Sequence, residues 1–374
     1  MRVVLFCHSL ISDWNHGNAH FLRGIVRELR RRGHAVRVFE PDCSWSLGNL
    51  VADAGAAAIE DFKAAYPELT STFYEPGTID LDWALEGADV VIVHEWSDHK
   101  LVRRIGRHRR TNDYCLLFHD THHRAMTDPE SMAAYDLSEF DGVLAFGEAL
   151  RRIYLERGWA RAAWTWHEAA DPTVFHPIEA PREGDLVWIG NWGDEERTQE
   201  LREFLLDPVR ELGLKASVYG VRYPQEALEA LSDAGITYRG YLANARVPEV
   251  FARYGVTVHV PRRPYAQALP GIPTIRVFEA LACGIPLISA PWDDVEHLFT
   301  PGRDFLVAPD GEAMRRQLRL VLADRDYAAA LADRGRRAVL ARHTCAHRVD
   351  ELSAILQDGF GIDTSTEADA CVAG

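Results

Sequence analysis

The stretch Pro270-Gly-Ile-Pro-Thr-Ile-Arg-Val-Phe-Glu-Ala-Leu-Ala-Cys-Gly-Ile-Pro-Leu-Ile-Ser289 decides how the second half of this 374-residue chain folds. A Pro/Gly loop leads into a helix that carries Thr274, Arg276 and Glu279. Gly284 follows in the position of a helix C-cap, and an apolar strand comes next. A helix N-terminus attracts phosphate, and an arginine adds a forked donor. An ordinary αβ unit with one surface ion pair fits the same spacing.

The bulk properties describe a globular protein of more than one domain. A chain of this length suits two domains of roughly 150–180 residues each. Every apolar run is far shorter than the roughly 20 residues of a membrane span. The six cysteines form no Cys-x-x-Cys pair, which argues against a zinc or redox motif. The start of the chain reads as a strand, without a signal-peptide core. We therefore expect a cytoplasmic protein.

The net charge of -15 argues against one class of partner. Nucleic-acid binding requires a basic face that neutralises phosphates, although a local basic patch is compatible with this charge. We therefore expect no nucleic acid as a main partner.

Apolar strands and amphipathic helices alternate through the first half of the chain. This alternation, with strands that are apolar throughout, is typical of a doubly wound parallel sheet covered on both faces. The helix at 18–32 shows a 3.6-residue apolar period and ends at Gly33. We expect strands at 2–8, 36–40, 89–94, 114–119 and 142–146, and a further helix at 148–157.

A linker at 171–184 separates this series from a second one. The second series predicts strands at 186–189, 216–219, 237–238 and 257–260, and helices at 198–206, 224–233, 247–254, 311–322, 326–340 and 343–356. The predicted domains are a Rossmann-like domain at 1–176 and a second Rossmann-like domain at 177–340, followed by a helix at 341–356 and a disordered tail at 357–374.

The opening stretch resembles the donor site of GT-B glycosyltransferases of the CgeB-like (spore-maturation protein related) group. In that group the pattern PG-x-P-x-x-R-x-FEALA-x-G-x-P-LI carries the site, and His343-Thr-x-x-x-Arg348 also fits. A more distant similarity links the chain to family 4 glycosyltransferases. The resemblance implies an α/β, GT-B architecture of two Rossmann-like doubly wound domains facing across a cleft. In that architecture 1–176 is the acceptor-side domain, 177–340 is the nucleotide-sugar-binding domain, and the helix at 341–356 crosses back to the first domain. The resemblance also implies a metal-independent transferase without a cofactor. Its donor would be a nucleotide diphosphate sugar, with UDP or dTDP favoured, and its acceptor a small molecule or a glycan.

The same resemblance assigns roles to single residues. Arg276 and Arg197 would hold the diphosphate, and Glu279 would accept the ribose hydroxyls. Gly17 and Asn18 face the diphosphate in similar enzymes, although a simple helix cap explains them equally. The full set of expected donor contacts is Gly17, Asn18, Arg197, Tyr241, Leu242, Arg262, Gly271, Thr274, Ile275, Arg276 and Glu279.

One position departs from the family 4 pattern. Many retaining enzymes of that type carry Glu-x7-Glu, in which the first glutamate touches the donor sugar. Glu279 matches the second glutamate, but the first falls at Gly271. The identity of the sugar and the expected retention of configuration are therefore open.

Polar residues end two of the strands in the first half. His119, Asp120 and two further histidines follow one strand, and they predict a metal site, a sugar-positioning role for His119 as in similar enzymes, or a polar strand end. Glu95, Asp120 and Asp13 are candidate bases towards an acceptor hydroxyl, because a neighbouring carboxylate can raise a pKa towards neutrality. Each could equally be a solvated acid. Trp14 and Trp96 could stack on an acceptor ring or pack in the core.

Two other features leave alternatives open. The basic run at 100–110 predicts either an amphipathic helix with weak membrane-surface contact or a solvated helix face. For the whole chain, a glycosyltransferase is the leading hypothesis. A GT-B nucleotide-sugar epimerase and a non-catalytic carbohydrate- or partner-binding protein are the alternatives.

Overall fold

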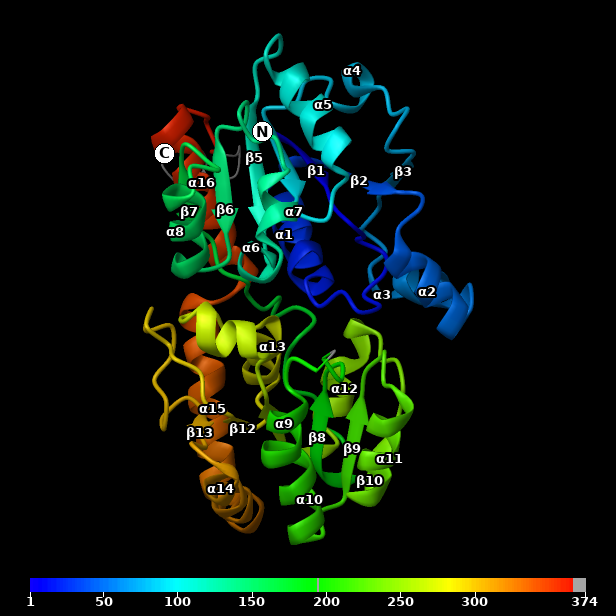
Figure 1. The fold of residues 1–374 in the computed structure, drawn as a ribbon, viewed down its shortest axis with the longest axis vertical. Coiled ribbons are helices and arrows are strands. Elements are labelled where there is room, and N and C mark those ends of the chain that lie inside the picture. Colours follow the sequence, from blue (N-terminus) through cyan, green and yellow to red (C-terminus); the bar gives the residue numbers. More distant parts are fainter. Residues whose placement is uncertain (194, 366–374) are drawn as a thin grey trace. The chain divides into compact units, whose positions relative to one another are not determined.

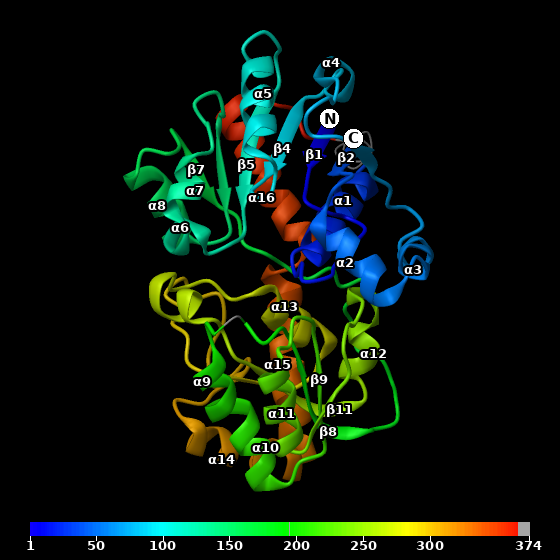
Figure 2. The same cartoon turned by 45° about the vertical axis from the view of Figure 1, so that its right-hand side comes forward.

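The computed structural model describes residues 1–193 and 195–365, which form two compact units. Unit 1 comprises Met1–Glu168 together with the segment from Cys345 onward, and unit 2 comprises Ala169–Thr344. Each unit has its own parallel sheet with helices on both faces (Figure 1, Figure 2). The boundary lies before the predicted residue 176, because Ala170 already bonds to unit 2: its N–H donates to the His343 carbonyl at 3.0 Å.

The sheet of unit 1 has the strand order β3-β2-β1-β4-β5-β6-β7 in the described part of the chain. All pairs are parallel, and the central strands are buried along their length. The order places the carboxyl ends of β2, β1, β4 and β5 next to one another. The strands are β1 (Arg2–Phe6), β2 (Ala35–Pro41), β3 (Thr72–Tyr74), β4 (Val90–His94), β5 (Cys115–Asp120), β6 (Gly142–Ala145) and β7 (Ala163–Thr165).

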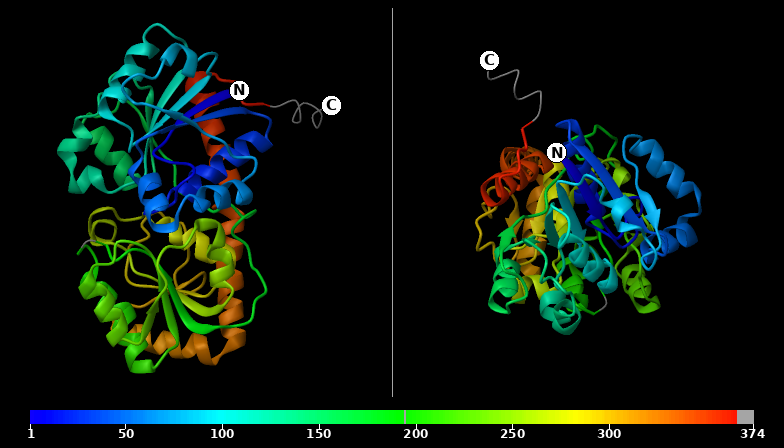
Figure 3. Two further views of the ribbon diagram at one scale, coloured as in Figure 1. Left: turned by 90° about the vertical axis from the view of Figure 1, so that its right-hand side faces the viewer. Right: turned by 90° about the horizontal axis from the view of Figure 1, so that it is seen from above.

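Helices cover both faces of this sheet (Figure 3). The first of them buries one apolar stripe and stops where Gly33 takes a positive φ of 84°, as the sequence predicts. The helices are α1 (Ala19–Arg31), α2 (Trp45–Ala54), α3 (Ala57–Ala65), α4 (Leu81–Ala84), α5 (His99–Arg109), α6 (Arg124–Thr127), α7 (Pro129–Ala133), α8 (Glu148–Glu156) and α16 (Cys345–Phe360).

The C-terminal helix α16 packs in unit 1 against α1. Trp166, which is 1% exposed, donates its indole N–H to the Arg348 carbonyl at 2.8 Å. Arg32, the residue after α1, forms an ion pair with Asp350 of α16 at 2.6 Å. The helix runs to Phe360, so the prediction of a tail from residue 357 is wrong for 357–360. Residues 366–374 of that predicted tail lie outside the described residues.

The basic helix α5 keeps its apolar face inside unit 1, and the weak membrane-surface contact predicted for 100–110 stays a prediction. Its apolar side chains Leu101, Val102 and Ile105 are 0% exposed, because they pack in the core of unit 1. On its outer side Arg110 pairs with Glu139 at 2.7 Å. The apolar face is therefore not available to lipid. Every helix in the described part of the chain is too short or too polar to cross a bilayer.

The sheet of unit 2 has the order β10-β9-β8-β11-β12-β13, again parallel throughout the described residues. Its strands are β8 (Gly184–Ile189), β9 (Ala216–Tyr219), β10 (Ile236–Tyr238), β11 (Tyr254–His259), β12 (Leu287–Ser289) and β13 (Leu306–Val307). Its helices are α9 (Thr198–Leu201), η1 (Arg202–Leu206), α10 (Asp207–Leu212), α11 (Gln225–Asp233), η2 (Asn244–Arg246), α12 (Val247–Phe251), η3 (Pro264–Ala268), α13 (Ile275–Cys283), α14 (Gly311–Ala323) and α15 (Arg325–Arg342).

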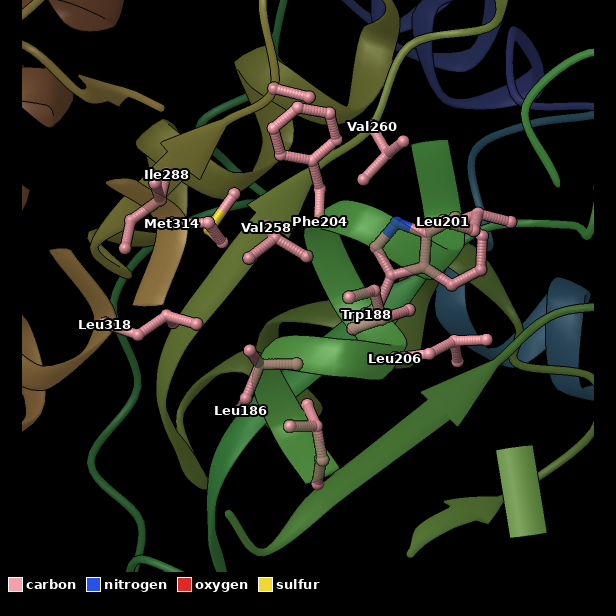
Figure 4. Packing of buried hydrophobic residues seen from close by; sticks show 14 of the residues in the cluster. Leu186, Trp188, Leu201, Phe204, Leu206, Val258, Val260, Ile288, Met314 and Leu318 are labelled. Atoms are coloured by element: carbon pink, nitrogen blue, oxygen red, sulfur yellow. The ribbon is translucent and has the colours of Figure 1, made fainter. Parts of the chain in front are cut away.

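Apolar side chains from both ends of unit 2's sequence form its core. Leu186 and Trp188 of β8 lie with Val258 of β11 and Met314 of α14 in one cluster (Figure 4). The helix predicted at 198–206 differs from the prediction: after one α-helical turn it widens into the π-helical segment η1 and continues as α10. Pro208 gives the reason, because its ring cannot fit against the carbonyl one α-helical turn earlier.

Candidate functional site

Three arginines lie close together at the carboxyl edge of unit 2's sheet. Arg197 comes after β8, Arg262 comes after β11, and Arg276 is the second residue of α13. Burial lowers the pKa of Arg197 to about 9, and repulsion by Arg262 and Arg276 contributes. Cations brought this close within an acidic protein indicate a site for an anion.

Arg197 is held by uncharged groups. Its Nη1 donates to the Val260 carbonyl at 2.9 Å and its Nη2 to the Asn191 carbonyl at 2.5 Å. The Trp188 ring lies 5.0 Å from its guanidinium carbon. Its Nε is buried without a partner among the described residues. Gly193, with φ of 99°, permits this position, since a Cβ there would lie 2.8 Å from that Nε.

The other two arginines have carboxylate partners. Arg262 pairs with Glu196 at 2.8 Å, and Arg276 donates to Glu279 in the next turn of α13. The Glu279 side chain is 0% exposed. Glu279 therefore orients Arg276, and its carboxylate is not open to solvent. The predicted ribose contact requires this side chain to become accessible when a donor binds.

The N-terminus of α13 adds unpaired backbone donors to the arginine cluster. Thr274 occupies the N-cap, but its side chain does not cap the helix. Its hydroxyl lies 3.2 Å from Nε2 of His259, whose Nδ1 lies 2.9 Å from the Ser289 hydroxyl. Burial lowers the pKa of His259 to about 3, and Arg197 and Arg276 contribute, so this imidazole is neutral. The Val277 N–H donates to the Thr274 carbonyl at 3.0 Å, so the N–H groups of Ile275 and Arg276 are the ones left for an anion.

Gly271 takes a positive φ of 88°, which favours glycine. A Cβ at Gly271 would lie 2.8 Å from Oε1 of Glu296. A carboxylate therefore lies beside Gly271, although it comes from a later part of the chain. Sequence spacing missed Glu296, because it lies on a separate loop after β12.

The remaining residues of unit 2 that were expected to contact the donor are Ile275, Tyr241 and Leu242. Ile275 is buried at the start of α13. Tyr241 and Leu242 are part-exposed on the loop after β10, two strands from β8 in the sheet order. Their predicted contact with the nucleobase stays a prediction.

In unit 1, Glu95 and Asp120 form a sealed carboxyl pair. Both are 0% exposed at the ends of β4 and β5. Arg124 donates to Glu95 at 2.9 Å, the Thr121 N–H donates to Glu95 at 3.1 Å, and the Tyr154 hydroxyl donates to Asp120 at 2.7 Å. Burial, with repulsion by Asp120, raises the pKa of Glu95 to about 8. The pair therefore holds a proton at neutral pH.

The three candidate bases are not open to an acceptor in this structure. Glu95 and Asp120 are sealed as described, because strands, helices and Arg124 enclose them. Asp13 pairs with Arg23 at 2.8 Å, and both side chains are at most 5% exposed. Arg23 also donates to two backbone carbonyls of the loop after β1, so Asp13 helps to fix that loop.

His119 lies in the core and not at an open edge. Its ring centroid is 5.8 Å from Phe21 of α1, 5.0 Å from Trp166 and 5.2 Å from His94. Burial lowers its pKa to about 3, and neither ring nitrogen has a partner among the described residues. A direct contact with a sugar is therefore not supported. In the described ranges, no group of three or more His, Cys, Asp and Glu side chains could hold a metal ion.

Residues of the loop between β1 and α1 that were predicted to contact a ligand make contacts within unit 1. Gly17 is exposed, and the Asn18 side chain donates to the Thr121 hydroxyl instead of capping α1. Trp14 is 7% exposed and donates to Asp53 at 2.5 Å. Trp96 is part-exposed, with the Arg124 guanidinium 3.9 Å from its ring centroid.

Comparison with known proteins supports the fold. Residues 197–354 match the family model described as glycosyl transferase-like, a range that includes the arginine cluster. No curated protein matches the chain in sequence.

Several solved structures share the fold over nearly the whole chain. Sucrose-phosphate synthase from Thermosynechococcus elongatus is 14% identical, covers 96% of this chain and 99% of its own, and gives a TM-score of 0.66. An alpha-glucosyltransferase in complex with UDP-glucose and DNA is 11% identical, with coverages of 96% and 99% and a TM-score of 0.70. HepE from Anabaena in complex with UDP-glucose is 13% identical, with coverages of 96% and 100% and a TM-score of 0.67.

These likenesses show that the chain has the GT-B fold with two parallel-sheet Rossmann-like domains, so the fold class predicted from the sequence is confirmed. The narrower resemblance to the CgeB-like group and to family 4 enzymes stays a prediction.

Proposed function

We propose that the protein is a glycosyltransferase that moves a sugar, in the manner of a hexosyltransferase, from a nucleoside diphosphate sugar to an acceptor hydroxyl. The observation that carries this proposal is the cluster of Arg197, Arg262 and Arg276 at the uncapped N-terminus of α13. The cluster lies in the segment that matches the glycosyl transferase-like family.

The chemistry of the cluster suits a departing diphosphate. Negative charge develops on the leaving phosphate oxygens, and donors fixed in advance stabilise it without reorganisation. Arg276 is oriented by Glu279, and Arg197 is fixed by two carbonyl oxygens. The repulsion among the arginines is relieved when an anion binds, so part of the binding energy is already stored in the ligand-free chain. These cations would replace a divalent metal, and we propose activity without one.

Two finer points belong to this proposal. The HepE and alpha-glucosyltransferase structures contain UDP-glucose, which favours a uridine or thymidine diphosphate donor here. We also propose retention of the anomeric configuration, which NMR of the product would decide. The cytoplasmic location predicted from the cysteines stays a prediction.

Calorimetric titration with UDP, dTDP, GDP, ADP and CMP tests the proposal. Wild-type protein should bind UDP or dTDP, with or without magnesium. Arg276→Ala should weaken that binding at least about tenfold, because a charged hydrogen bond to phosphate is worth about 1.5–3 kcal/mol. Arg316→Ala is the matched control, since Arg316 is a helical arginine of α14 that pairs with Glu312 on the surface. Equal affinities of the two variants would contradict the donor-site assignment.

A further inference from the structure

Four aromatic rings follow four neighbouring strands of unit 1, one ring after each strand. Trp45 follows β2, His8 follows β1, Trp96 follows β4 and His122 follows β5, which is the order of these strands in the sheet. The ring centroids of successive members are 5.2 Å, 6.4 Å and 5.3 Å apart. We call these four residues the aromatic row. It spans three strand spacings, which is about 14 Å.

The rings at both ends of the row are at least partly exposed to solvent, and His8 in the middle is buried. Trp45 is 41% exposed, Trp96 and His122 are part-exposed, and His8 is 5% exposed. An indole left open beside other rings offers a large, rigid, apolar face to a ligand. In open α/β sheets, ligands bind outside the carboxyl ends of the strands, where this row lies.

The charges around the row favour a neutral ligand. Burial lowers the pKa of His8 to about 4, so its ring is neutral at physiological pH. Arg124 lies on the Trp96 ring, and the Glu95–Asp120 pair beside it keeps one carboxylate charge when it holds one proton, which offsets the charge of Arg124. Near the other end, Trp14 packs on Trp45 and bonds Asp53, which adds an acidic group. The net charge of -15 acts in the same direction.

Two neutral imidazoles behind the row have hydrogen-bonding capacity to spare. His16 lies 5.5 Å from His8 and 6.2 Å from His94, between ring centroids. Nε2 of His16 and Nδ1 of His94 are buried without a partner among the described residues. Burial lowers both pKa values, so both rings are neutral. Nε2 of His94 already lies 3.2 Å from the Thr121 hydroxyl and His16 bonds the Ser9 backbone, so each ring has one nitrogen left, which donates or accepts according to the tautomer. Hydroxyl groups are both donors and acceptors, and they match such rings better than phosphates do.

We propose that the aromatic row binds the acceptor and that the acceptor is a neutral oligosaccharide whose sugar rings pack against the exposed parts of Trp45, Trp96 and His122, which are tilted relative to one another. This inference rests on the proposed glycosyltransferase function, because it names the acceptor class of that reaction. The length of the row exceeds one sugar ring, which selects a chain over a monosaccharide. Single-stranded nucleic acid also stacks on aromatic rings, but its phosphates require cationic side chains beside those rings.

An array of printed oligosaccharides tests the inference with fluorescently labelled full-length protein and saturating UDP. The array carries neutral, sialylated and sulfated chains, and single-stranded DNA is titrated separately by anisotropy. Wild-type protein should bind neutral chains of several residues. Trp45→Ala should weaken this binding about tenfold, which corresponds to ~1.4 kcal/mol, and Trp45→Phe should retain most of it. Trp83→Ala is the control, since Trp83 is a 53% exposed indole on α4, which precedes β4 at the other end of the strands.

Each other outcome overturns the inference. Binding confined to charged glycans or DNA, absence of any bound glycan, or equal binding by Trp45→Ala and Trp83→Ala would do so. UDP titration separates this failure from failure of the proposed function. If UDP binds and neutral glycans do not, the acceptor assignment alone fails. If neutral glycans bind through Trp45 and no nucleotide binds, the row is a carbohydrate site and the transferase proposal fails.

Discussion

Substitution of Glu95 by glutamine should reduce the loss of unfolding free energy that occurs between about pH 7 and about pH 9. The carboxyl of Glu95 is enclosed by Asp120, Arg124, Tyr135 and Tyr154, and its pKa is raised to about 8 from the ordinary 4.5. An acid with a raised folded-state pKa stabilises the fold while it is protonated, and this contribution is lost as pH rises through the folded value. Between about pH 7 and about pH 9 the folded chain gives up this proton, which the unfolded chain lacks throughout.

The size of the effect follows from that pKa. A group with a folded pKa of about 8 loses on the order of 1 kcal/mol of unfolding free energy over this interval. For a unit of this size the loss corresponds to a few degrees in the unfolding temperature. Glu95→Gln has no proton to lose in this interval, so it should flatten the dependence. Its amide oxygen can accept from Thr121 or from Arg124 but its NH2 group can accept from neither, so the variant is also expected to be less stable than wild type at both pH values.

Urea unfolding followed by fluorescence at both pH values measures the difference between wild type and variant. Glu148→Gln is the control, because hydrogen bonds from Arg151 and Arg152 lower the pKa of Glu148 to about 2, and this carboxyl is ionised throughout the interval. Glu148→Gln should therefore keep the wild-type slope. If Glu95→Gln also keeps that slope, the sealed carboxyl pair does not hold a proton, and the reasoning fails.

Three further predictions concern other parts of the chain. UDP affinity should fall about fivefold from pH 9 to pH 10 in calorimetry, because Arg197, whose pKa is lowered to about 9 in the free protein, must be charged to bind; a flat profile would argue against its role. Trp166→Ala should lower the unfolding free energy by ~3–5 kcal/mol, since the ring is 1% exposed and bonds α16, and an unchanged unfolding curve would contradict that docking. Glu296→Gln should slow release of UDP from the donor while UDP affinity stays the same, because its carboxylate lies beside Gly271; unaltered turnover would remove Glu296 from the site.

The sequence predicts the fold well where local signals and packing agree. The helix α13 begins and ends where the opening stretch indicates, because Thr274 precedes it and Gly284 takes the left-handed conformation that stops it. The apolar runs of β4 and β5 likewise predict buried parallel strands. Pro208 is the residue in the sequence that marks the place where the predicted helix widens.

The candidate site was harder to predict, because side-chain partners depend on packing. An apolar strand such as β5 is covered on both faces, so its sequence does not say that His119 faces α1. Nor does spacing reveal that Glu279 is sealed by its neighbour Arg276. The pairing of Glu95 with Asp120 could be predicted in part, since each residue lies at the end of a strand. The members of the aromatic row also follow strand ends. In both cases the prediction further requires the order of the strands in the sheet, which the sequence pattern leaves open.

Hydrogen–deuterium exchange with and without saturating UDP tests the central claim most directly, because it locates the bound donor. The account predicts protection in peptides that cover 190–197 and 260–279, where the arginine cluster and the N-terminus of α13 lie, and loss of that protection in Arg276→Ala. Protection confined to unit 1, or unchanged exchange in both segments at a UDP concentration that saturates binding, would contradict it.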